Sequence, residues 1–600
     1  MMRSRIDWTR AAAVFTAFAC VVGTMGCQST PVGLENENRV AMEDTSEKEE
    51  IGESVSNREL LKKNSLETEE IDSWKSEVYQ EIVFEGDQIS AADGVIVEGT
   101  TVTITDEGVY VLSGVLNNGR IIVNASKTDR VTLVWNGAKI FCEDASPVCV
   151  EKADKTIFYL ADGTENVISD GENYLFLDEE TEPDAAVFAK DDLTIKGTGS
   201  LSVYANYYDG IVCKNDLKIT GGTLTVDAVH QGIKGKDSLT IQGGTILVHA
   251  GDDGIKSSNE AGVEEDGKEV GWVKIEGGDI IITAKDDAVH AESDLIINGG
   301  NITITESYEG LEGACIYIND GEISLYASDD GVNAAGYAVE NTMSNEWEEK
   351  EIPDDRRDME KKMNEDGKKD GWEELQDKPE FDGTKMPRFD EAGGNWDNRG
   401  MGTISSGGYL EINGGNLYIN AQGDGIDANG SIVMNGGTVR IDGTESGGDS
   451  AIDYDGTFEI NGGVLAGVGN GAMAQTATSD SKQACMAVYF DTMQKAESVI
   501  TVLDDSGEEI FSYQPKKQYN FFTFSSDQLI MENTYTVLVD QIEIQSFIMS
   551  DKITVVGDAF SMGVGGFGGG FHGRDHNGIP REGMEAESGE MPLMPPDKVQ

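Results

Sequence analysis

Apolar and polar residues alternate along most of this chain, in short runs that are separated by pairs of glycines. One run from Leu217 reads Leu-Lys-Ile-Thr-Gly-Gly-Thr-Leu-Thr-Val-Asp-Ala, and the next, from Leu239, reads Leu-Thr-Ile-Gln-Gly-Gly-Thr-Ile-Leu-Val-His-Ala. Because the aliphatic residues fall on every second position, the pattern predicts β-strands. The glycine pairs predict tight turns between these strands. They lie at Gly221-Gly222, Gly243-Gly244, Gly277-Gly278, Gly299-Gly300, Gly414-Gly415, Gly436-Gly437 and Gly462-Gly463.

The regular spacing of the glycine pairs predicts a solenoid. Neighbouring pairs without an intervening insertion are 22 residues apart, a period typical of structural repeats. Two alternating runs and one short aliphatic run predict three strands per coil of about 22 residues. We therefore predict an all-β fold: a right-handed, single-stranded parallel β-helix over about 94 to 472, followed by a small C-terminal β module. An ordinary β-sandwich fits single segments but does not explain eight copies in register.

One aliphatic position recurs in every copy of the repeat. It follows a glycine or alanine, as in Gly210-Ile211 and Ala288-Val289, and a constant apolar position in a stacked repeat is expected to point inward. The predicted inner column is Ile211, Ile233, Ile255, Val289, Leu311, Val332, Ile426 and Ile452.

Acidic residues surround this column. Two positions before each inner residue stand Asp209, Gln231, Asp253, Asp287, Glu309, Asp330, Asp424 and Ser450, and one position further back the repeat adds Asp252, Asp286, Asp329 and Asp449. One position after each inner residue stand Val212, Lys234, Lys256, His290, Glu312, Asn333, Asp427 and Asp453. Stacked coils lie about 4.8 Å apart, so carboxylates in one column repel each other by about 1 kcal/mol per pair in water, and more strongly near a protein surface.

Two interpretations of the acidic columns follow. In the early coils Lys234 and Lys256 stand beside the acids, which predicts a solvated, self-neutralised ladder. In the later coils no cation accompanies the acids, and clusters of oxygen ligands suit Ca²⁺. Gln231 and Ser450 lack the expected carboxylate and weaken the prediction for their own coils. The predicted calcium ligands are Asp209, Asp252, Asp253, Asp286, Asp287, Asp329, Asp330, Asn333, Asp424, Asp427, Asp449 and Asp453.

The ordered succession of phrases resembles a known family, the bacterial carbohydrate-binding β-helix domain that folds like pectate lyases and is associated with calcium. The phrases include Tyr110-Val-Leu-Ser-Gly114, Leu160-Ala-Asp-Gly-Thr-Glu-Asn166, Gly232-Ile-Lys-Gly-Lys236 and Asp252-Asp-Gly-Ile-Lys256. The resemblance covers about 82 to 556. It implies a secreted or surface-anchored protein that binds plant-type or acidic polysaccharide, with acids of the repeat holding Ca²⁺.

Two other functions stay open. A calcium-dependent polysaccharide lyase of the pectate type needs an arginine or lysine to remove a proton beside the bound uronate carboxylate. Between Arg130 and the end of the repeats, only Arg440 lies outside the long insertion, and the candidate lysines are Lys214, Lys234 and Lys256. A purely structural surface adhesin or spacer shares every feature except the ligand. The sequence assigns no catalytic residue and does not identify the residues that contact carbohydrate.

The N-terminus predicts export and lipidation. Three arginines precede the apolar stretch 11 to 22, which is too short to span a bilayer and is typical of a signal peptide. It ends in Thr24-Met-Gly-Cys27, which resembles the lipobox of bacterial lipoproteins, although Thr24 replaces the usual leucine. We predict a signal peptide over 1–27, lipidation of Cys27, and an extracellular protein anchored to the bacterial cell surface.

Composition marks the remaining boundaries. We expect an acidic, disordered tether over 28–75, the β-helix over 76–480 with a long disordered insertion at 337–404, the β module over 481–557, and a disordered tail rich in Gly, Met and Pro over 558–600. The cysteines beyond the leader show no metal-type spacing and are expected to be buried, with a Cys142–Cys149 disulfide as the alternative.

Net charge limits the partners. A formal charge of −65 argues against nucleic acid, whose phosphates it would repel. A polysaccharide is compatible with that charge, either cellulose-like through hydrogen bonds and ring stacking or uronate-containing through bridging Ca²⁺. We expect a monomer whose membrane contact is the lipid anchor alone.

Overall fold

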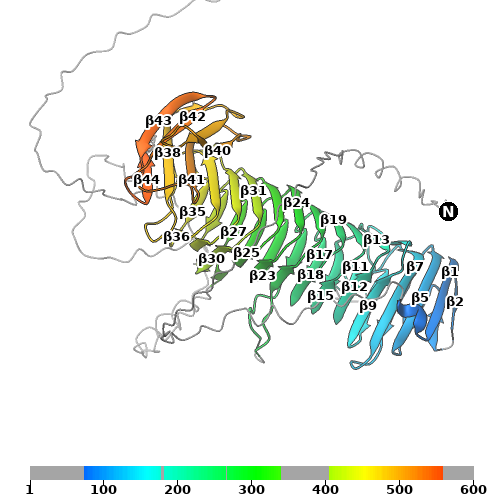
Figure 1. Cartoon of the computed structure of the whole chain (residues 1–600). Coiled ribbons are helices and arrows are strands. Elements are labelled where there is room, and N and C mark those ends of the chain that lie inside the picture. The colour runs from blue at the N-terminus through cyan, green and yellow to red at the C-terminus, as the bar shows by residue number, and fades with distance from the viewer. Residues whose placement is uncertain (1–72, 93, 177–181, 265–266, 339–404, 558–600) are drawn as a thin grey trace, which may run out of the picture. The chain divides into compact units, whose positions relative to one another are not determined.

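The computed structural model describes residues 73–557 except 93, 177–181, 265–266 and 339–404 (Figure 1). The signal peptide, Cys27, the C-terminal tail and nearly all of the tether and the long insertion therefore lie outside the described residues. Within them, the chain is built of β-strands, with one short 3₁₀ helix, η2 (Ser73–Ser76). None of the described helices is long and apolar enough to cross a membrane.

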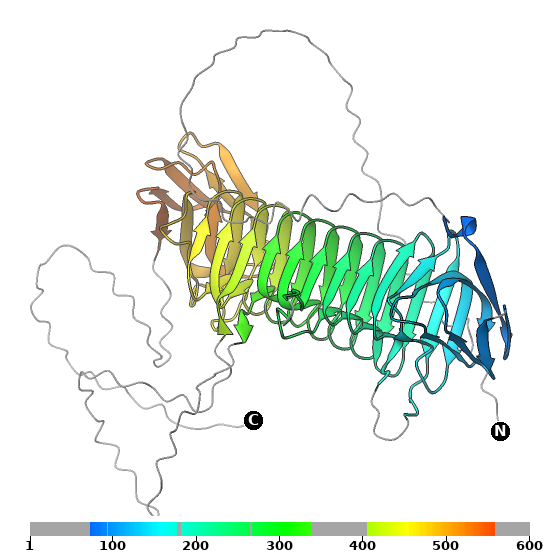
Figure 2. The ribbon, with the colours of Figure 1, turned by 90° about the horizontal axis from the view of Figure 1, so that it is seen from below.

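Most strands belong to one long, largely parallel sheet that winds through three rows of stacked strands (Figure 2). The first row contains β4 (Thr101–Ile104), β6 (Arg120–Asn124), β8 (Val148–Lys152), β11 (Ala185–Ala189), β14 (Asp209–Cys213), β17 (Ile233–Gly235), β20 (Ile255–Ser257), the beginnings of β23 (Val289–Ile297) and β25 (Leu311–Ile318), β27 (Val332–Ala334), β32 (Ile426–Ala428) and β35 (Ile452–Tyr454).

The second row begins with the first parts of β1 (Tyr79–Gly86), β5 (Gly108–Leu116) and β7 (Arg130–Cys142). It continues through β9 (Lys155–Leu160), β12 (Asp192–Gly197), β15 (Asp216–Ile219), β18 (Ser238–Ile241), β21 (Trp272–Ile275), the ends of β23 and β25, β30 (Gly408–Ile412), β33 (Gly430–Met434) and β36 (Phe458–Ile460). The third row contains β10 (Glu165–Asp170), β13 (Ser200–Ala205), β16 (Thr223–Ala228), β19 (Thr245–Ala250), β22 (Asp279–Thr283), β24 (Asn301–Glu306), β26 (Glu322–Ala327), β31 (Asn416–Ala421), β34 (Thr438–Asp442) and β37 (Val464–Gly469).

The predicted inner column is confirmed. Ile211 pairs with Ile233, Ile233 with Ile255, and the register continues through Val289 to the last coil. All eight side chains are at most 2% exposed and belong to one continuous apolar core. The all-β, repeating architecture predicted from the alternation is thus present, and it is consistent with a β-helix.

Asparagines form a second stacked column at the turns between the second and third rows. The Nδ2 of Asn319 donates to Asn298 at 2.8 Å, that of Asn413 to Asn319 at 2.8 Å, that of Asn435 to Asn413 at 2.9 Å, and that of Asn461 to Asn435 at 2.9 Å. Asn319 and Asn413 are 94 positions apart in sequence yet occupy adjacent coils. The chain leaves and re-enters the solenoid through a short antiparallel pair, β28 (Tyr337–Ala338) with β29 (Ser405–Ser406).

Replacing Asn413 by alanine is expected to destabilise the solenoid modestly. The change removes one donated and one accepted hydrogen bond, but the side chain is exposed and water replaces both partners in part. We expect a loss of about 1 kcal/mol, measured as a lower urea midpoint. Asn301→Ala, at an exposed position outside the asparagine column, is the matched control. Equal midpoints for the two variants would contradict a stabilising role of the column.

Antiparallel strands cover both ends of the described solenoid. At the first coils β2 (Gln88–Ala91) pairs with β1, and β3 (Val95–Glu98) pairs with β4. At the last coil β37 pairs with β41 (Tyr519–Ser525), which also pairs with β38 (Cys485–Gln494), and β44 (Ile553–Val556) lies beside β38. A separate antiparallel sheet has the order β40 (Glu509–Tyr513), β39 (Ile500–Leu503), β42 (Thr534–Val539) and β43 (Ile542–Ile548).

A buried carboxylate joins the C-terminal strands to the last coils. Asp442, at the end of β34, accepts a hydrogen bond from the Tyr513 hydroxyl at 2.6 Å and another from the Lys516 backbone N–H at 3.0 Å.

The cysteines between residues 142 and 485 are all buried and free, so Cys142 and Cys149 are not bonded to each other. The burial of these cysteines agrees with the expectation that they fill the interior as small apolar residues.

Candidate functional site

The acidic columns predicted from the repeat lie on the turns that lead from the third row to the first row. Their backbones stack in order: the Gly210 N–H donates to the Gln231 carbonyl at 2.8 Å, Gly232 to Asp253 at 2.9 Å, and Gly331 to Asp424 at 2.9 Å. Because each coil presents its acid directly beside the acid of the next coil, the side chains form one continuous row. We call these turn residues, together with the outward residues one position after the inner column, the acidic ladder.

In the early coils a histidine contacts two acids of the ladder. His230 Nδ1 lies 2.6 Å from Asp209 Oδ1, and His230 Nε2 lies 2.9 Å from Asp252 Oδ2. The ring of Tyr208 stacks on the imidazole with 3.9 Å between centroids and is 39% exposed. Asp209 and Asp252, two of the predicted calcium ligands, are therefore engaged by a side chain of the ladder.

The two lysines of the ladder differ in their surroundings. Lys256 Nζ lies 2.7 Å from Asp253 Oδ2, and their side chains are only 17% and 1% exposed. Burial opposes the charge of Lys256, but Asp253 raises its pKa above the usual value, so this ammonium is held as a cation. Lys234, its register partner, forms no hydrogen bond or ion pair with any residue in the described ranges. Lys256 is therefore neutralised by direct contact with Asp253, whereas Lys234 acts on an acid, Glu292, only through its charge and without a hydrogen bond or ion pair in the described ranges.

In the middle coils several ligand-type side chains converge on His290. Its Nδ1 lies 2.9 Å from Asp287 Oδ2 and 2.5 Å from Glu312 Oε2. Burial disfavours the imidazolium, but hydrogen bonds with these acids and with Glu292 raise its pKa to about 12. Two groups in the described part bring three ligand atoms within 4.8 Å of one another: Asp253, Asp287 and His290, and Asp287, Glu309 and Glu312. This raised pKa favours the protonated imidazole, so His290 brings positive charge to the acids of the first group.

In the late coils the carboxylates stack without a cationic side chain among their contacts in the described range. Asn333, Asp427 and Asp453 are successive register partners. Asp330 accepts the Asp424 N–H at 2.6 Å, and Asp424 accepts the Ser450 N–H at 2.5 Å.

Burial, and repulsion by their neighbours, raise the pKa of several late carboxyl groups. The values are about 7 for Asp330, about 7 for Asp424 and about 6 for Asp427. In each case burial is the largest cause, and neighbouring acids of the ladder add to it. The raised pKa values show that deprotonating these carboxyl groups is unfavourable without a counter-ion.

The remaining predicted ligands lie at the edges of these groups. Asp286 follows Asp252 in the ladder, and burial and nearby acids raise its pKa to about 6. Asp329 follows Tyr308, Asp449 accepts a hydrogen bond from the Ser446 hydroxyl at 3.1 Å, and Asp453 accepts one from the Gln475 amide. All twelve predicted ligands thus lie on the ladder, divided among its early, middle and late coils.

Two features of the ladder fit a bound cation. Buried oxygens of Asp253 (Oδ1), Gln231 (Oε1) and Asn333 (Oδ1) have no hydrogen-bond partner among the residues that the structure describes, and a buried acceptor without a donor is unfavourable. At Gly423, an added Cβ would lie 2.4 Å from Asp330 Oδ1 and 2.6 Å from Asp329 Oδ1. The missing side chain at 423 therefore leaves room for two carboxylates to approach each other. The oxygen-rich donor set of the late coils suits a hard cation such as Ca²⁺.

Comparison with known proteins places this chain in a family. The family model described as carbohydrate-binding domain-containing protein matches residues 98–342 and 397–557. The chain belongs to this carbohydrate-binding domain family. A protein of the same description from Acetivibrio thermocellus is 42% identical over 155 residues, which is 25% of this chain and 54% of that protein, so the chain spans about half the length of this relative. A solved structure of the polysaccharide lyase-like protein from C. thermocellum, a gadolinium derivative, is 42% identical and covers 38% of this chain and 91% of its own, with a TM-score of 0.37.

Sequence reasoning missed three side chains of the middle coils. Glu309, Glu312 and His290 stand in the same repeat columns as the predicted ligands, but they were not counted among them. Their position in the repeat identifies them. The strand register of the carbohydrate-binding domain places any acid or histidine of those columns beside the column residues of the adjacent coils. The identity of the residue alone gives no such indication.

Proposed function

We propose that this member of the carbohydrate-binding domain family is an extracellular, surface-anchored protein that binds plant-type or acidic polysaccharide on a calcium-stabilised, right-handed β-helix. The observation that carries the proposal is the late part of the acidic ladder, where Asp330, Asp424 and Asp427 stack with raised pKa values and without a cationic partner in the described residues. Bound Ca²⁺ would supply the missing positive charge through oxygens of Asp329, Asp330, Asn333, Asp424, Asp427, Asp449 and Asp453.

The right hand of the solenoid follows from a general rule. A strand joined through a crossover to a parallel neighbour in one sheet takes the right-handed path in nearly all proteins, because strand twist favours it. An experimental structure with left-handed coils would overturn this part of the proposal. Surface anchoring rests on the leader and Cys27, and mass spectrometry of the N-terminal peptide from membrane fractions tests it by the mass of a lipid on that cysteine.

The early ladder offers the groups that contact an acidic glycan. Lys234 interacts with Glu292 through its charge but forms no hydrogen bond or ion pair in the described range, so its side-chain nitrogen is available to a uronate carboxylate. Two exposed tyrosines belong to the same column and each offers a ring face for stacking: Tyr208 in the early ladder, whose other face stacks on His230, and Tyr308 in the middle coils. Calcium on the late coils would add bridging contacts to the same polymer. The glycan is therefore expected to lie along the ladder.

Retention on glycans with and without EDTA tests this function. On an array of neutral and acidic polysaccharides, we expect binding to polygalacturonate that decreases when EDTA removes Ca²⁺. Binding to no glycan under either condition would leave a structural spacer as the function.

Lys234→Ala is expected to weaken retention on polygalacturonate by about tenfold, because one charge-assisted hydrogen bond is lost. Affinity electrophoresis measures the change. Lys218→Ala, at an outward position of the second row, removes the same charge away from the ladder and is the control. Equal weakening by both variants would mean that net charge, and not contact at Lys234, governs binding.

The lyase alternative is favoured by one observation: within the described residues, the side-chain nitrogen of Lys234 beside the ladder forms no hydrogen bond or ion pair, so that after losing its own proton it is placed to accept one from a bound uronate. Lys256 is a poor base because Asp253 holds its proton. Incubation with polygalacturonate and Ca²⁺, followed by the absorbance of the unsaturated product, decides between binding and cleavage. We expect no product. Turnover that is lost in Lys234→Ala would replace binding with catalysis as the function.

A further inference from the structure

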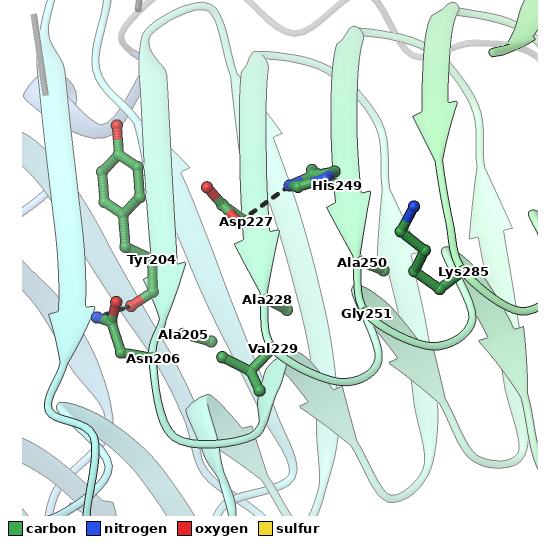
Figure 3. Close-up of a pocket in the computed structure, with 10 residues that line it drawn as sticks. All are labelled: Tyr204, Ala205, Asn206, Asp227, Ala228, Val229, His249, Ala250, Gly251 and Lys285. Atoms are coloured by element: carbon green, nitrogen blue, oxygen red, sulfur yellow. Dashed lines mark hydrogen bonds and ion pairs between the residues drawn. The ribbon is translucent and has the colours of Figure 1, made fainter. Parts of the chain in front are cut away.

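A second concave site lies outside the acidic ladder, on the outer side of the third row (Figure 3). It is a groove of about 280 Å³ lined by residues of four successive coils. Tyr204, Asp227 and His249 stand side by side in it, because they are register partners on β13, β16 and β19. Lys285 lies at the far end, two residues after β22.

The shape of the groove comes from small residues between large ones. Its floor contains Ala205, Ala228 and Ala250, which belong to the buried face of the strands. At Gly251 an added Cβ would lie 2.0 Å from the Val229 carbonyl oxygen, so no side chain can stand there without moving the backbone. Tyr204 closes one end and Lys285 the other. With coils about 4.8 Å apart, the length is that of a short segment of an extended polymer, and not of a compact cofactor.

The polar side chains of the groove already have partners. His249 Nδ1 lies 3.3 Å from Asp227 Oδ1, and these side chains are 60% and 57% exposed. Lys285 is paired with Glu306. Lys285 is therefore shared with an acid, and the exposed carboxylate of Asp227 repels an anionic ligand. The same carboxylate is a strong acceptor for a hydroxyl group, and Lys285 and His249 retain further donor capacity.

Apolar surface lies beside these polar groups. Val229 is 59% exposed at the rim, one coil away from Tyr204, and Tyr204 stands at the end of the groove opposite Lys285. A ligand that matches both must present carbon-bound hydrogens on one face and hydroxyl groups along its edges. Sugar rings have this character, and pockets that bind them combine an apolar surface with a few converging polar groups.

We propose that this groove binds a segment of a neutral, hydroxyl-rich saccharide, independently of calcium. Asp227 accepts hydrogen bonds from sugar hydroxyls, Lys285 donates to ring or hydroxyl oxygens, and Tyr204 packs against a ring. The inference rests on the proposed function and adds to it: the acidic ladder takes the charged polymer with Ca²⁺, and the groove takes neutral residues without it. Val229 and His230 are adjacent in sequence, so the groove borders the early end of the ladder.

Isothermal titration of the full chain with cellohexaose, and separately with trigalacturonate, tests the groove in buffer containing EDTA. We expect binding of cellohexaose only. Asp227→Asn should weaken it about tenfold, because the amide is a poorer acceptor than the carboxylate. Lys285→Ala, at the opposite wall, should weaken it as well. Thr225→Ala is the control, since Thr225 lies on the same strand and the same outer face but does not line the groove.

Two results would overturn the inference. If trigalacturonate binds in EDTA and Asp227→Asn strengthens that binding, the groove is an anion site. If cellohexaose affinity is unchanged in both groove variants, or cellohexaose does not bind at all, the groove is not a saccharide site. Calcium-dependent retention of the same preparation on polygalacturonate separates the two failures: its persistence leaves the function of the ladder intact. Melting curves of each variant show whether the fold is retained.

Discussion

Calcium is expected to raise the melting temperature of the protein by about 5 °C when present at about 100 times its dissociation constant, and EDTA to remove the gain. The reason is the late part of the acidic ladder, where Asp330, Asp424 and Asp427 are stacked and partly buried without a cationic partner in the described range. A bound divalent ion replaces the repulsion among these carboxylates by attraction. Because only the folded chain brings them together, binding stabilises the folded state.

The double variant Asp424→Asn with Asp427→Asn should lose most of the calcium response. It should also be at least as stable as the parent chain in EDTA, because the amides carry no charge. Gly423→Ala tests the geometry without changing charge, since the new Cβ would displace the carboxylates of Asp329 and Asp330. Asp279→Asn, an exposed acid of the third row, is the charge-matched control. An unchanged calcium response in the double variant would place the ion elsewhere on the ladder.

Without metal, the stability of the protein is expected to fall by several degrees of melting temperature as the pH rises from about 5 to about 8. Burial, together with neighbouring acids, raises the pKa of Asp330 and Asp424 to about 7 and that of Glu309 to about 8. In the unfolded chain these groups titrate near pH 4. A carboxyl group whose folded pKa is raised contributes its full share of stability below the unfolded pKa and loses it as the pH passes the folded pKa.

Thermal melts in EDTA across this pH range measure the effect, and added Ca²⁺ should flatten it above neutral pH. A variant with Asp330→Asn and Asp424→Asn should show a shallower decline, because two of the groups that charge late in the titration are gone. A melting temperature that increases between about pH 5 and about pH 8 in EDTA would mean that other groups dominate the pH dependence of this fold.

The solenoid could be predicted from sequence because each coil repeats the same pattern of inward apolar residues and glycine turns. Taken alone, Ile255 indicates only an apolar position. Because an aliphatic residue recurs at the same place in every repeat, these residues define a column. The structure confirms that column through Ile452. The prediction succeeded across the segment between Ala338 and Ser405 because the repeat resumes in the same phase. The antiparallel caps follow no repeat, and their pairings could not be derived from spacing.

The candidate site was predicted only in part. The columns were correct, because the register places acids such as Asp330 and Asp424 next to each other. The partners of individual acids were not predictable, since they depend on side-chain directions: His230 reaches two acids, and Lys234 reaches none in the described range. The groove at Tyr204, Asp227 and His249 was not predicted at all, because these positions lie outside the acidic columns and their residue types share no recurring pattern.

The short pair β28 and β29 has a consequence for engineering. Tyr337 lies opposite Ser406, and the coils on either side of this stem are joined as neighbours by Asn413 and Asn319 and by Glu322 and Asn416. The stacking of the coils therefore does not depend on the number of residues between the two strands of the stem. The stem is therefore a suitable insertion site. We expect that a tag, an enzyme domain or a second binding domain fused between Ala338 and Ser405 would be displayed without altering the stacking of the coils.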